Sequence, residues 1–326
     1  MTKKHFAGIA VILSCLLFVV FLIYLPVEVA GQRPAMSRAL VVNAGFLAIT
    51  AAVVIVFLLI IATKRDFVRG QIATFFRFRH LLFLMVKRDF VTRYRRSILG
   101  VLWSLLNPLL TMMVLTAVFS TLFRFEIEFF PVYLISGQLI FGLFSESTSL
   151  AMGSIATGGG ATIKKIYVPK YIFPLSKVLS SLVNVGFSLI AFFAVVIVTR
   201  APFHWTMFLI PIPLFYILVF SIGIGLFLSS IAVFFRDITY IYGVFITLLT
   251  FMTPIFYPVS ILPERVYHIM HLNPIFHYVD YFRELVQHGQ IPGLWSNIIC
   301  LGFALAALCL GIYVKMSQQS KYILYL

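Results

Sequence analysis

Long uncharged stretches constrain the fold of this chain more than any other feature of its sequence. Residues 97–123 contain no charged side chain over 27 positions, and residues 6–25 contain none over 20. A helix of about 20 apolar residues is long enough to cross the ~30 Å hydrocarbon layer of a bilayer. Only 11% of all residues are charged, against about 25% in soluble domains, and the mean hydropathy is +1.06. The sequence therefore predicts an all-α integral membrane protein.

Stretches of this kind predict about eight transmembrane helices. They lie at residues 6–25, 39–62, 97–123, 129–152, 178–198, 201–235, 238–262 and 293–314. A cleaved signal peptide is the alternative for the first stretch, but apolar cores of signal peptides are usually 7 to 15 residues long. The sequence that follows, PVEVAGQRP, is also a poor cleavage site. We therefore expect a retained helix.

The distribution of Lys and Arg predicts the orientation. With these eight helices, 19 of the 25 basic residues fall on one side of the membrane, including ten between residues 64 and 96. Basic residues are enriched in cytoplasmic segments, so both termini are expected in the cytoplasm. The net charge of +15 then reflects membrane topology, and no nucleic-acid partner is needed to explain it.

Residues 72–98 are expected to form an amphipathic interface helix on the cytoplasmic surface. On a helical wheel, several apolar or aromatic residues fall within roughly 60° of Phe83, with Lys87 as a basic exception, and the residues on the opposite side are mainly basic. The first group is Val86, Phe90, Tyr94 and Ile98; the second is Arg88, Thr92, Arg95 and Arg96. Such a helix lies in the headgroup plane. Because residues 97–123 are uncharged, the chain should turn into the membrane near residues 97–100.

Proline and short polar turns predict the ends of several helices. Pro211 and Pro213 suggest an interfacial start for the helix in 201–235, and the TPIFYP sequence at 253–258 should end the preceding span. Residues 259–291 mix charged and apolar residues and are interrupted at Asn273 and Pro274. We expect an external hairpin of two short amphipathic helices, which rests in or dips into the outer interface as a re-entrant element.

No catalytic or metal-binding motif occurs in the sequence. A phosphate loop, an HExxH motif and a GxSxG motif are all missing, and the three cysteines lie in apolar runs without ligand spacing. His268 and His271 lie about one turn apart, but no third ligand is apparent. Gly158, Gly159 and Gly160 fit a flexible hinge better than a phosphate site. The chain is therefore not expected to be an enzyme or to carry a cofactor.

Several motifs in order resemble the membrane subunit of ABC exporters of the ABC-2 type, specifically the polysaccharide and polyol phosphate exporters. They are KRDFVTRYRRSILGVLWSLLNP at 87–108, IKKIYVPKYIFPLSKVLSS at 163–181, VFFRDI at 233–238, TPIFYP at 253–258 and LNPI at 272–275. The resemblance covers residues 72–326 and implies that they form a transmembrane domain of six helices. Residues 1–71, with two further helices, depart from the family pattern.

The resemblance implies a function in export of O antigen, capsule or teichoic acid across the inner membrane. Members of this family are half-transporters that form a homodimer with two copies of a separate ABC ATPase, which binds ATP and Mg. The substrate is a polyprenyl-pyrophosphate-linked glycan. One alternative is a small-molecule or drug efflux permease of the same architecture, which neighbouring glycosyltransferase genes would disfavour. Another is a secondary transporter or scaffold, with which no ATPase would co-purify.

The loop around Pro169 is expected to contact the ATPase. It combines lysines with aromatic residues and two prolines, a composition that suggests a rigid apolar knob exposed to water. The residues are Lys164, Lys165, Tyr167, Pro169, Tyr171, Phe173 and Pro174. The alternative is a solvated basic turn that only fixes topology, since the lysines alone would serve that purpose.

Two further groups of residues are candidates for substrate binding. Arg93, Arg95 and Arg96 could bind the pyrophosphate of the carrier lipid, or simply hold anionic headgroups. Aromatic rings could stack on sugars in a conduit, although an ordinary interfacial belt would use the same residues: Trp103, Tyr133, Phe141 and Phe144. Glu146 is the only acid in any expected span and is a functional candidate, or it caps a polar cluster with Ser145 and Ser147.

Overall fold

The computed structural model describes residues 65–95, 99–121, 123, 127–155, 168–263, 266–267 and 270–318. Within these ranges the regular elements are all helices, which confirms the expected all-α class. The two predicted spans at 6–25 and 39–62 lie outside the described residues. The elements are α3 (Arg65–Tyr94), α4 (Leu102–Thr121), α5 (Phe130–Ser154), α7 (Ile172–Val198), η2 (Trp205–Leu209), α8 (Pro211–Phe234), α9 (Ile238–Met252), η3 (Val259–Ile261), α11 (Pro274–Val286) and α12 (Leu294–Gln318).

Four segments are long and apolar enough to cross a membrane: Leu102–Ser120, Ile172–Val198, Trp205–Phe234 and Leu294–Ser317. They correspond to four of the six spans predicted between residues 97 and 314. The other two predicted spans are α5 and α9. Helix α9 is apolar but has only 15 residues, because the TPIFYP segment ends it, and α5 carries Gln138 and Glu146 among its apolar residues.

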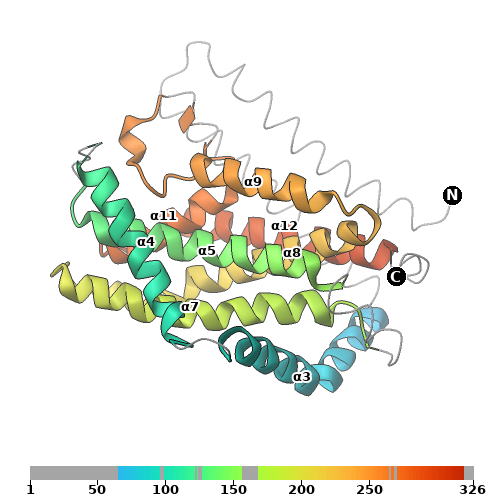
Figure 1. Cartoon of the computed structure of the whole chain (residues 1–326). Coiled ribbons are helices and arrows are strands. Elements are labelled where there is room, and N and C mark those ends of the chain that lie inside the picture. The colour runs from blue at the N-terminus through green and yellow to red at the C-terminus, as the bar shows by residue number, and fades with distance from the viewer. Residues whose placement is uncertain are drawn as a thin grey trace, which may run out of the picture.

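Helices α5, α7, α8 and α12 form the centre of the bundle, and they run roughly side by side in Figure 1. The closest pair is α8 and α12. A Cβ atom added to Gly223 would overlap the backbone of Ala307, and one added to Gly311 would overlap the carbonyl of Gly223. Small residues at such positions allow two helix backbones to touch, as in tightly packed membrane helices.

The segment expected to form the external hairpin is more deeply embedded than the sequence suggested. The break at Asn273 and Pro274 is confirmed, since the Asn273 side chain accepts a hydrogen bond from the Ile275 N–H and Pro274 begins α11. Helix α11 packs against α5, α8 and α12, and Tyr278 and Phe282 are fully buried. Its strongly apolar face explains this position better than a surface location.

Helix α3 begins at Arg65 and ends at Tyr94, so it starts earlier than the predicted interface helix at 72–98. It packs chiefly against α7, through Leu82 and Met85, while Phe83 remains 64% exposed on another side of the helix. Figure 1 shows α3 beside one end of α7. The predicted aromatic face is therefore divided: Phe83 faces outward, and Phe90 stacks on Phe187 of α7 with 5.9 Å between ring centroids.

The predicted turn between the interface helix and the span at 97–123 is confirmed. Helix α3 ends at Tyr94, α4 begins at Leu102, and Gly100 has a φ of +48°. Glycine adopts this left-handed conformation without steric cost, so it suits a sharp change of chain direction. A tight turn at Arg236 and Asp237 joins α8 to α9, and the predicted helix start at Pro211 is confirmed.

Candidate functional site

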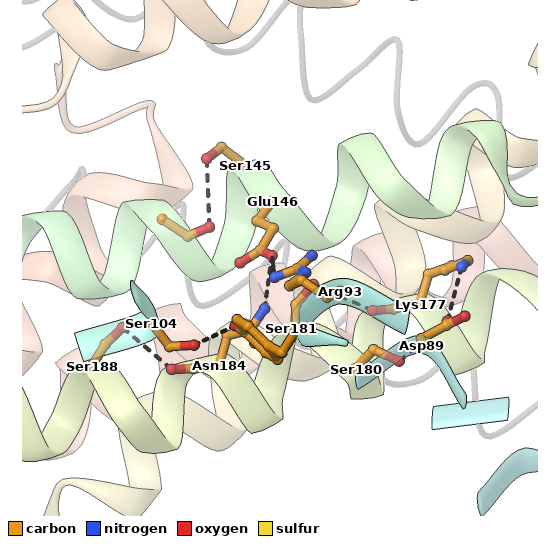
Figure 2. A network of polar contacts seen from close by, with 12 residues as sticks. Asp89, Arg93, Ser104, Ser145, Glu146, Lys177, Ser180, Ser181, Asn184 and Ser188 are labelled. Atoms are coloured by element: carbon orange, nitrogen blue, oxygen red, sulfur yellow. Dashed lines mark hydrogen bonds and ion pairs between the residues drawn. The ribbon is translucent and has the colours of Figure 1, made fainter. Parts of the chain in front are cut away.

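Two ion pairs link α3 to the membrane helices, as Figure 2 shows. Lys177 Nζ on α7 lies 2.8 Å from Asp89 Oδ2 on α3. Arg93 Nη1 on α3 lies 2.6 Å from Glu146 Oε1 on α5. Asp89 and Arg93 are four residues apart, so they project from the same face of α3. One helix face therefore carries an acid and a base that pair with two different helices.

Asn184 joins these helices at the same level. Its Nδ2 donates to Glu146 Oε1 at 2.8 Å, and its Oδ1 accepts from the Tyr94 hydroxyl at 3.2 Å. Ser104 of α4 donates to the Tyr94 oxygen, so four helices contribute to one network. Asn184 and Lys177 are seven residues apart, two turns along one face of α7.

The network corrects the alternative role suggested for Glu146. Ser145 and Ser147 do not bond to this carboxylate; they donate to the backbone carbonyls of Gly142 and Phe144 within α5. The partners of Glu146 are Arg93 and Asn184, which are far away in the sequence.

Each of the two interhelical ion pairs joins one cation to one carboxylate, and all four side chains are partly exposed. Arg88 Nη2 also lies 3.7 Å from Asp89 Oδ1. Burial lowers the pKa of the Arg93 guanidinium, but the ion pair with Glu146 and the nearby Tyr94 outweigh burial and leave the pKa above its ordinary value. Partly exposed ion pairs contribute only about 0–1 kcal/mol each to stability. Their main effect is therefore to position α3 against α5 and α7.

A cavity of about 370 Å³ begins at this network and extends between α4, α5, α7 and α9. Glu146 and Asn184 line it at one end, and Ile255 and Phe256, just beyond α9, line it at the other. Its polar lining comes from Asn107, Thr111, Gln138, Ser145, Glu146, Asn184, Ser188 and Thr250. Pockets of roughly 300–1,000 Å³ commonly hold small ligands.

The structure places the predicted conduit residues in three different environments. Phe141 lines the cavity. Trp103 is 46% exposed at the start of α4. Tyr133 and Phe144 turn into the core: the Tyr133 hydroxyl donates to the carbonyls of Pro254 and Tyr257, and Phe144 lies 5.5 Å from Phe220. The expectation that all four rings face a common conduit is therefore wrong for Tyr133 and Phe144, because their face of α5 packs on neighbouring elements.

Arg283 is a buried residue that was not among the predicted site residues. Its guanidinium lies 3.4 Å from the Tyr133 ring centroid. It donates to the carbonyls of Pro254 at 2.7 Å, Tyr133 at 3.1 Å and Ile255 at 3.3 Å. The sequence did contain an indication that Arg283 is buried, because it lies four residues after Val279 and therefore on the apolar face of its helix.

The loop around Pro169 is only partly described, since Lys164, Lys165 and Tyr167 lie outside the described residues. The expectation of exposure is wrong for Phe173 and Pro174, which are buried. Phe173 packs with Leu82 and Met85, because α3 covers the start of α7. Pro169 and Tyr171 remain half-buried at the edge of this cluster, and burial raises the pKa of the Tyr171 hydroxyl.

The remaining predicted residues lie near the end of α3 or in the 259–291 segment. Arg95 is exposed just after α3, and Arg96 lies outside the described residues. Within the described part of the chain, no three His, Cys, Asp or Glu side chains come together as metal ligands. His268 lies outside the described residues, so the histidine pair is not described as a unit.

Comparison with known proteins gives consistent matches over the same region. A profile described as ABC-2 type transporter matches residues 80–286. The O-antigen export system permease protein RfbA of Klebsiella pneumoniae is 29% identical over 247 residues, which cover 75% of this chain and 95% of that protein. The Myxococcus xanthus protein of the same name is 29% identical, with 67% of this chain and 84% of that protein covered. The polysialic acid transport protein KpsM of Escherichia coli is 25% identical, with 71% and 91% covered.

Proposed function

Because the chain belongs to the ABC-2 type transporter family, we propose that it is the membrane-spanning subunit of an ATP-driven exporter for a lipid-linked polysaccharide. The cargo would be of the O-antigen, capsule or teichoic acid type. The observation that carries this proposal is the set of relatives, whose names refer to O-antigen export and polysialic acid transport and which match over 84–95% of their own length. These names favour polysaccharide export over small-molecule efflux.

The chain is a transport permease and works with a separate ABC ATPase, as permeases of this family do. The sequence itself has no phosphate-binding loop. We further propose a homodimer that binds two ATPase copies. Apolar side chains left uncovered on α4 and α9, including Val114, Tyr240 and Val244, support a second copy or lipid against these helices. The half-buried edge at Pro169 and Tyr171, together with the side of α3 that does not pack on α7, is the proposed ATPase contact.

The proposed topology has eight transmembrane helices in the inner membrane, with both termini in the cytoplasm. The charge distribution supports this orientation. In this arrangement α3 lies at the cytoplasmic surface, the network of Figure 2 lies at the inner end of the bundle, and the 259–291 segment is a re-entrant hairpin on the outer side. The burial of α11 among α5, α8 and α12 supports a re-entrant position.

Recognition of the carrier lipid is proposed for the basic end of α3. Arg95 is exposed at the point where the chain turns toward α4, and Arg96 is the next residue. Arg93 already has Glu146 as its partner, so a carrier phosphate would have to compete with that carboxylate for the guanidinium. Of Arg93 and Arg95, Arg95 is thus the more readily available to a phosphate.

The proposal is tested in cells that lack this chain. These cells should lose surface polysaccharide and retain the lipid-linked polymer inside the cell. Expression of the wild-type chain should restore surface polysaccharide and remove the retained polymer. Surface polysaccharide and extracted carrier-linked polymer are measured by immunoblot in the same cultures. Normal surface polysaccharide in the deletion strain would refute the proposed function.

A further inference from the structure

The cavity beside the polar network has the dimensions of a ligand site. Its wall on α5 runs from Ile135 to Glu146, which is roughly 16 Å along a helix that rises 1.5 Å per residue. Its volume is about 370 Å³. The cavity is thus long and narrow, with the carboxylate of Glu146 at one end and the Phe256 ring at the other.

The lining is largely apolar, but it carries several neutral polar side chains and almost no charge. Neutral hydrogen-bonding side chains reach the cavity from α4, α5, α7 and α9: Asn107, Thr111, Gln138, Asn184, Ser188 and Thr250. Of the described residues that line it, only Glu146 carries a charge. Amides and hydroxyls can both donate and accept hydrogen bonds, so they match ligands rich in hydroxyl groups. The Phe141 ring adds an aromatic wall of the kind that packs against the apolar face of a sugar.

Gln138 provides a second, independent observation. Its Nε2 is buried and has no hydrogen-bond partner among the described residues, although the side chain lines the cavity. Buried amide donors are normally paired, so this one calls for an acceptor such as a hydroxyl or a carbonyl oxygen.

Gly142 lies between Gln138 and Glu146 on the face of α5 that lines the cavity, and it has no side chain to fill the space there. It lies one turn from Gln138 and one turn from Glu146, and a Cβ atom added to it would meet nothing within 4 Å. The backbone of α5 is therefore accessible to a ligand at this point, and a larger side chain would occupy the cavity itself.

We propose that this cavity is a binding subsite for one neutral glycosyl unit, held by the amides of Gln138 and Asn184 and by the Phe141 ring. The inference rests on the proposed function and specifies which part of the cargo the site takes. The inner end of the cavity adjoins the Arg93–Glu146 ion pair, so the bound unit is the sugar nearest the carrier phosphate. No cation is among the described residues that line the cavity, so the carboxylate of an acidic sugar would be desolvated there without a counter-charge.

The test measures sugar binding by the purified full-length chain in detergent micelles, using saturation-transfer NMR. The probes are N-acetylglucosamine, N-acetylneuraminic acid and inorganic pyrophosphate, each at about 10 mM, where a millimolar Kd is detectable. Wild-type protein should transfer saturation to the neutral sugar and much less to the acidic one. Pyrophosphate should not compete with the neutral sugar, because it has no cation in the cavity to bind.

Substitutions locate the binding. Gly142→Leu should abolish the signal by filling the cavity, and Gln138→Leu should weaken binding about tenfold, the effect of one lost hydrogen bond to a buried group. Gly142→Ala adds only a methyl group and should have an intermediate effect, which covers the case in which the leucine variant does not fold. Gly186→Leu is the matched control, since Gly186 also has open space around its Cβ position but lies on α7 outside the cavity lining.

Three outcomes would overturn the inference: no binding of the neutral sugar to wild-type protein, unchanged binding in folded Gly142→Leu and Gln138→Leu, or equal binding of the acidic sugar. None of these would touch the proposed function, which depends on surface polysaccharide in the deletion strain. Conversely, normal surface polysaccharide in that strain would refute the proposed function whatever the cavity binds.

Discussion

Arg283 should be a major contributor to the stability of the bundle, and its removal is the most direct test of the packing described above. The substitution Arg283→Met keeps a long apolar side chain but removes the guanidinium. It eliminates the contact with the Tyr133 ring and the hydrogen bonds to three carbonyls, those of Tyr133, Pro254 and Ile255. These carbonyls belong to α5 and to the segment after α9, so Arg283 joins three parts of the chain.

The size of the effect follows from what the three carbonyls retain. The Pro254 oxygen still accepts from the Tyr133 hydroxyl, and the Tyr133 oxygen still accepts from Ser136. The Ile255 oxygen loses the longest of the three bonds, at 3.3 Å. Leaving a buried carbonyl without a donor costs about 1–3 kcal/mol, and a desolvated contact between a cation and an aromatic ring contributes up to about 2 kcal/mol. Because two carbonyls keep a donor, we expect a loss of roughly 2–4 kcal/mol in the free energy of unfolding.

The assay is unfolding of the purified chain in mixed dodecyl maltoside and SDS micelles, followed by circular dichroism. Arg200→Ala is the control, because Arg200 is exposed in the turn after α7 and should change the free energy of unfolding by less than about 0.5 kcal/mol. Gly137→Ala probes the same site from another side, since the new Cβ would lie 2.9 Å from Arg283 Nη2. A loss below about 1 kcal/mol for Arg283→Met, or an equal loss for Arg200→Ala, would refute this account.

Four other predictions concern coupling, the carrier and topology. Tyr171→Ala should reduce the amount of ATPase that co-purifies without lowering the amount of folded permease. The binding free energy should fall by about 2–4 kcal/mol if Tyr171 is an interface hot spot. Unchanged association would mean that the loop only fixes the topology. Asp89→Asn removes the charge that holds Lys177, so it should change the stability of the chain by about 1 kcal/mol or less but reduce export per ATP hydrolysed, and a normal ratio would contradict the positioning role. Arg96→Lys keeps the charge but removes the planar guanidinium that can donate two hydrogen bonds to a phosphate, so surface polysaccharide should fall at matched expression. Wild-type export by both Arg96→Lys and Arg96→Ala would show that this residue does not bind the carrier. Cysteine at position 32 should react with an impermeant thiol reagent added to whole cells and cysteine at position 170 should not, and the reverse pattern would invert the topology.

The local features of the fold were predictable because each depends on neighbouring residues. The uncharged run after residue 96 indicated the turn near Gly100, and Asn273 with Pro274 indicated the start of a helix. In both cases the signal lies within a few positions of the structure that it determines.

The candidate site was predictable only in part, since its contacts join residues far apart in the sequence. Glu146 and Arg93 were each singled out, but their pairing spans 53 positions, and that of Asp89 with Lys177 spans 88. No periodicity within one helix encodes such a partner. The exposure of Phe173 was misjudged for a related reason, because it depends on where α3 lies rather than on the loop itself.

The glycine contact between α8 and α12 bears on which parts of the bundle could move during a transport cycle. Gly223 and Gly311 lie against the opposite backbones, so a larger side chain at either position would force the two helices apart. We therefore expect this closely packed pair to move as one unit. Helix α4 is different, because few of its side chains are buried, and α9 presents Tyr240 and Val244 to the exterior. We therefore expect rearrangements that open a path for cargo to involve α4 and α9 more than the α8–α12 pair.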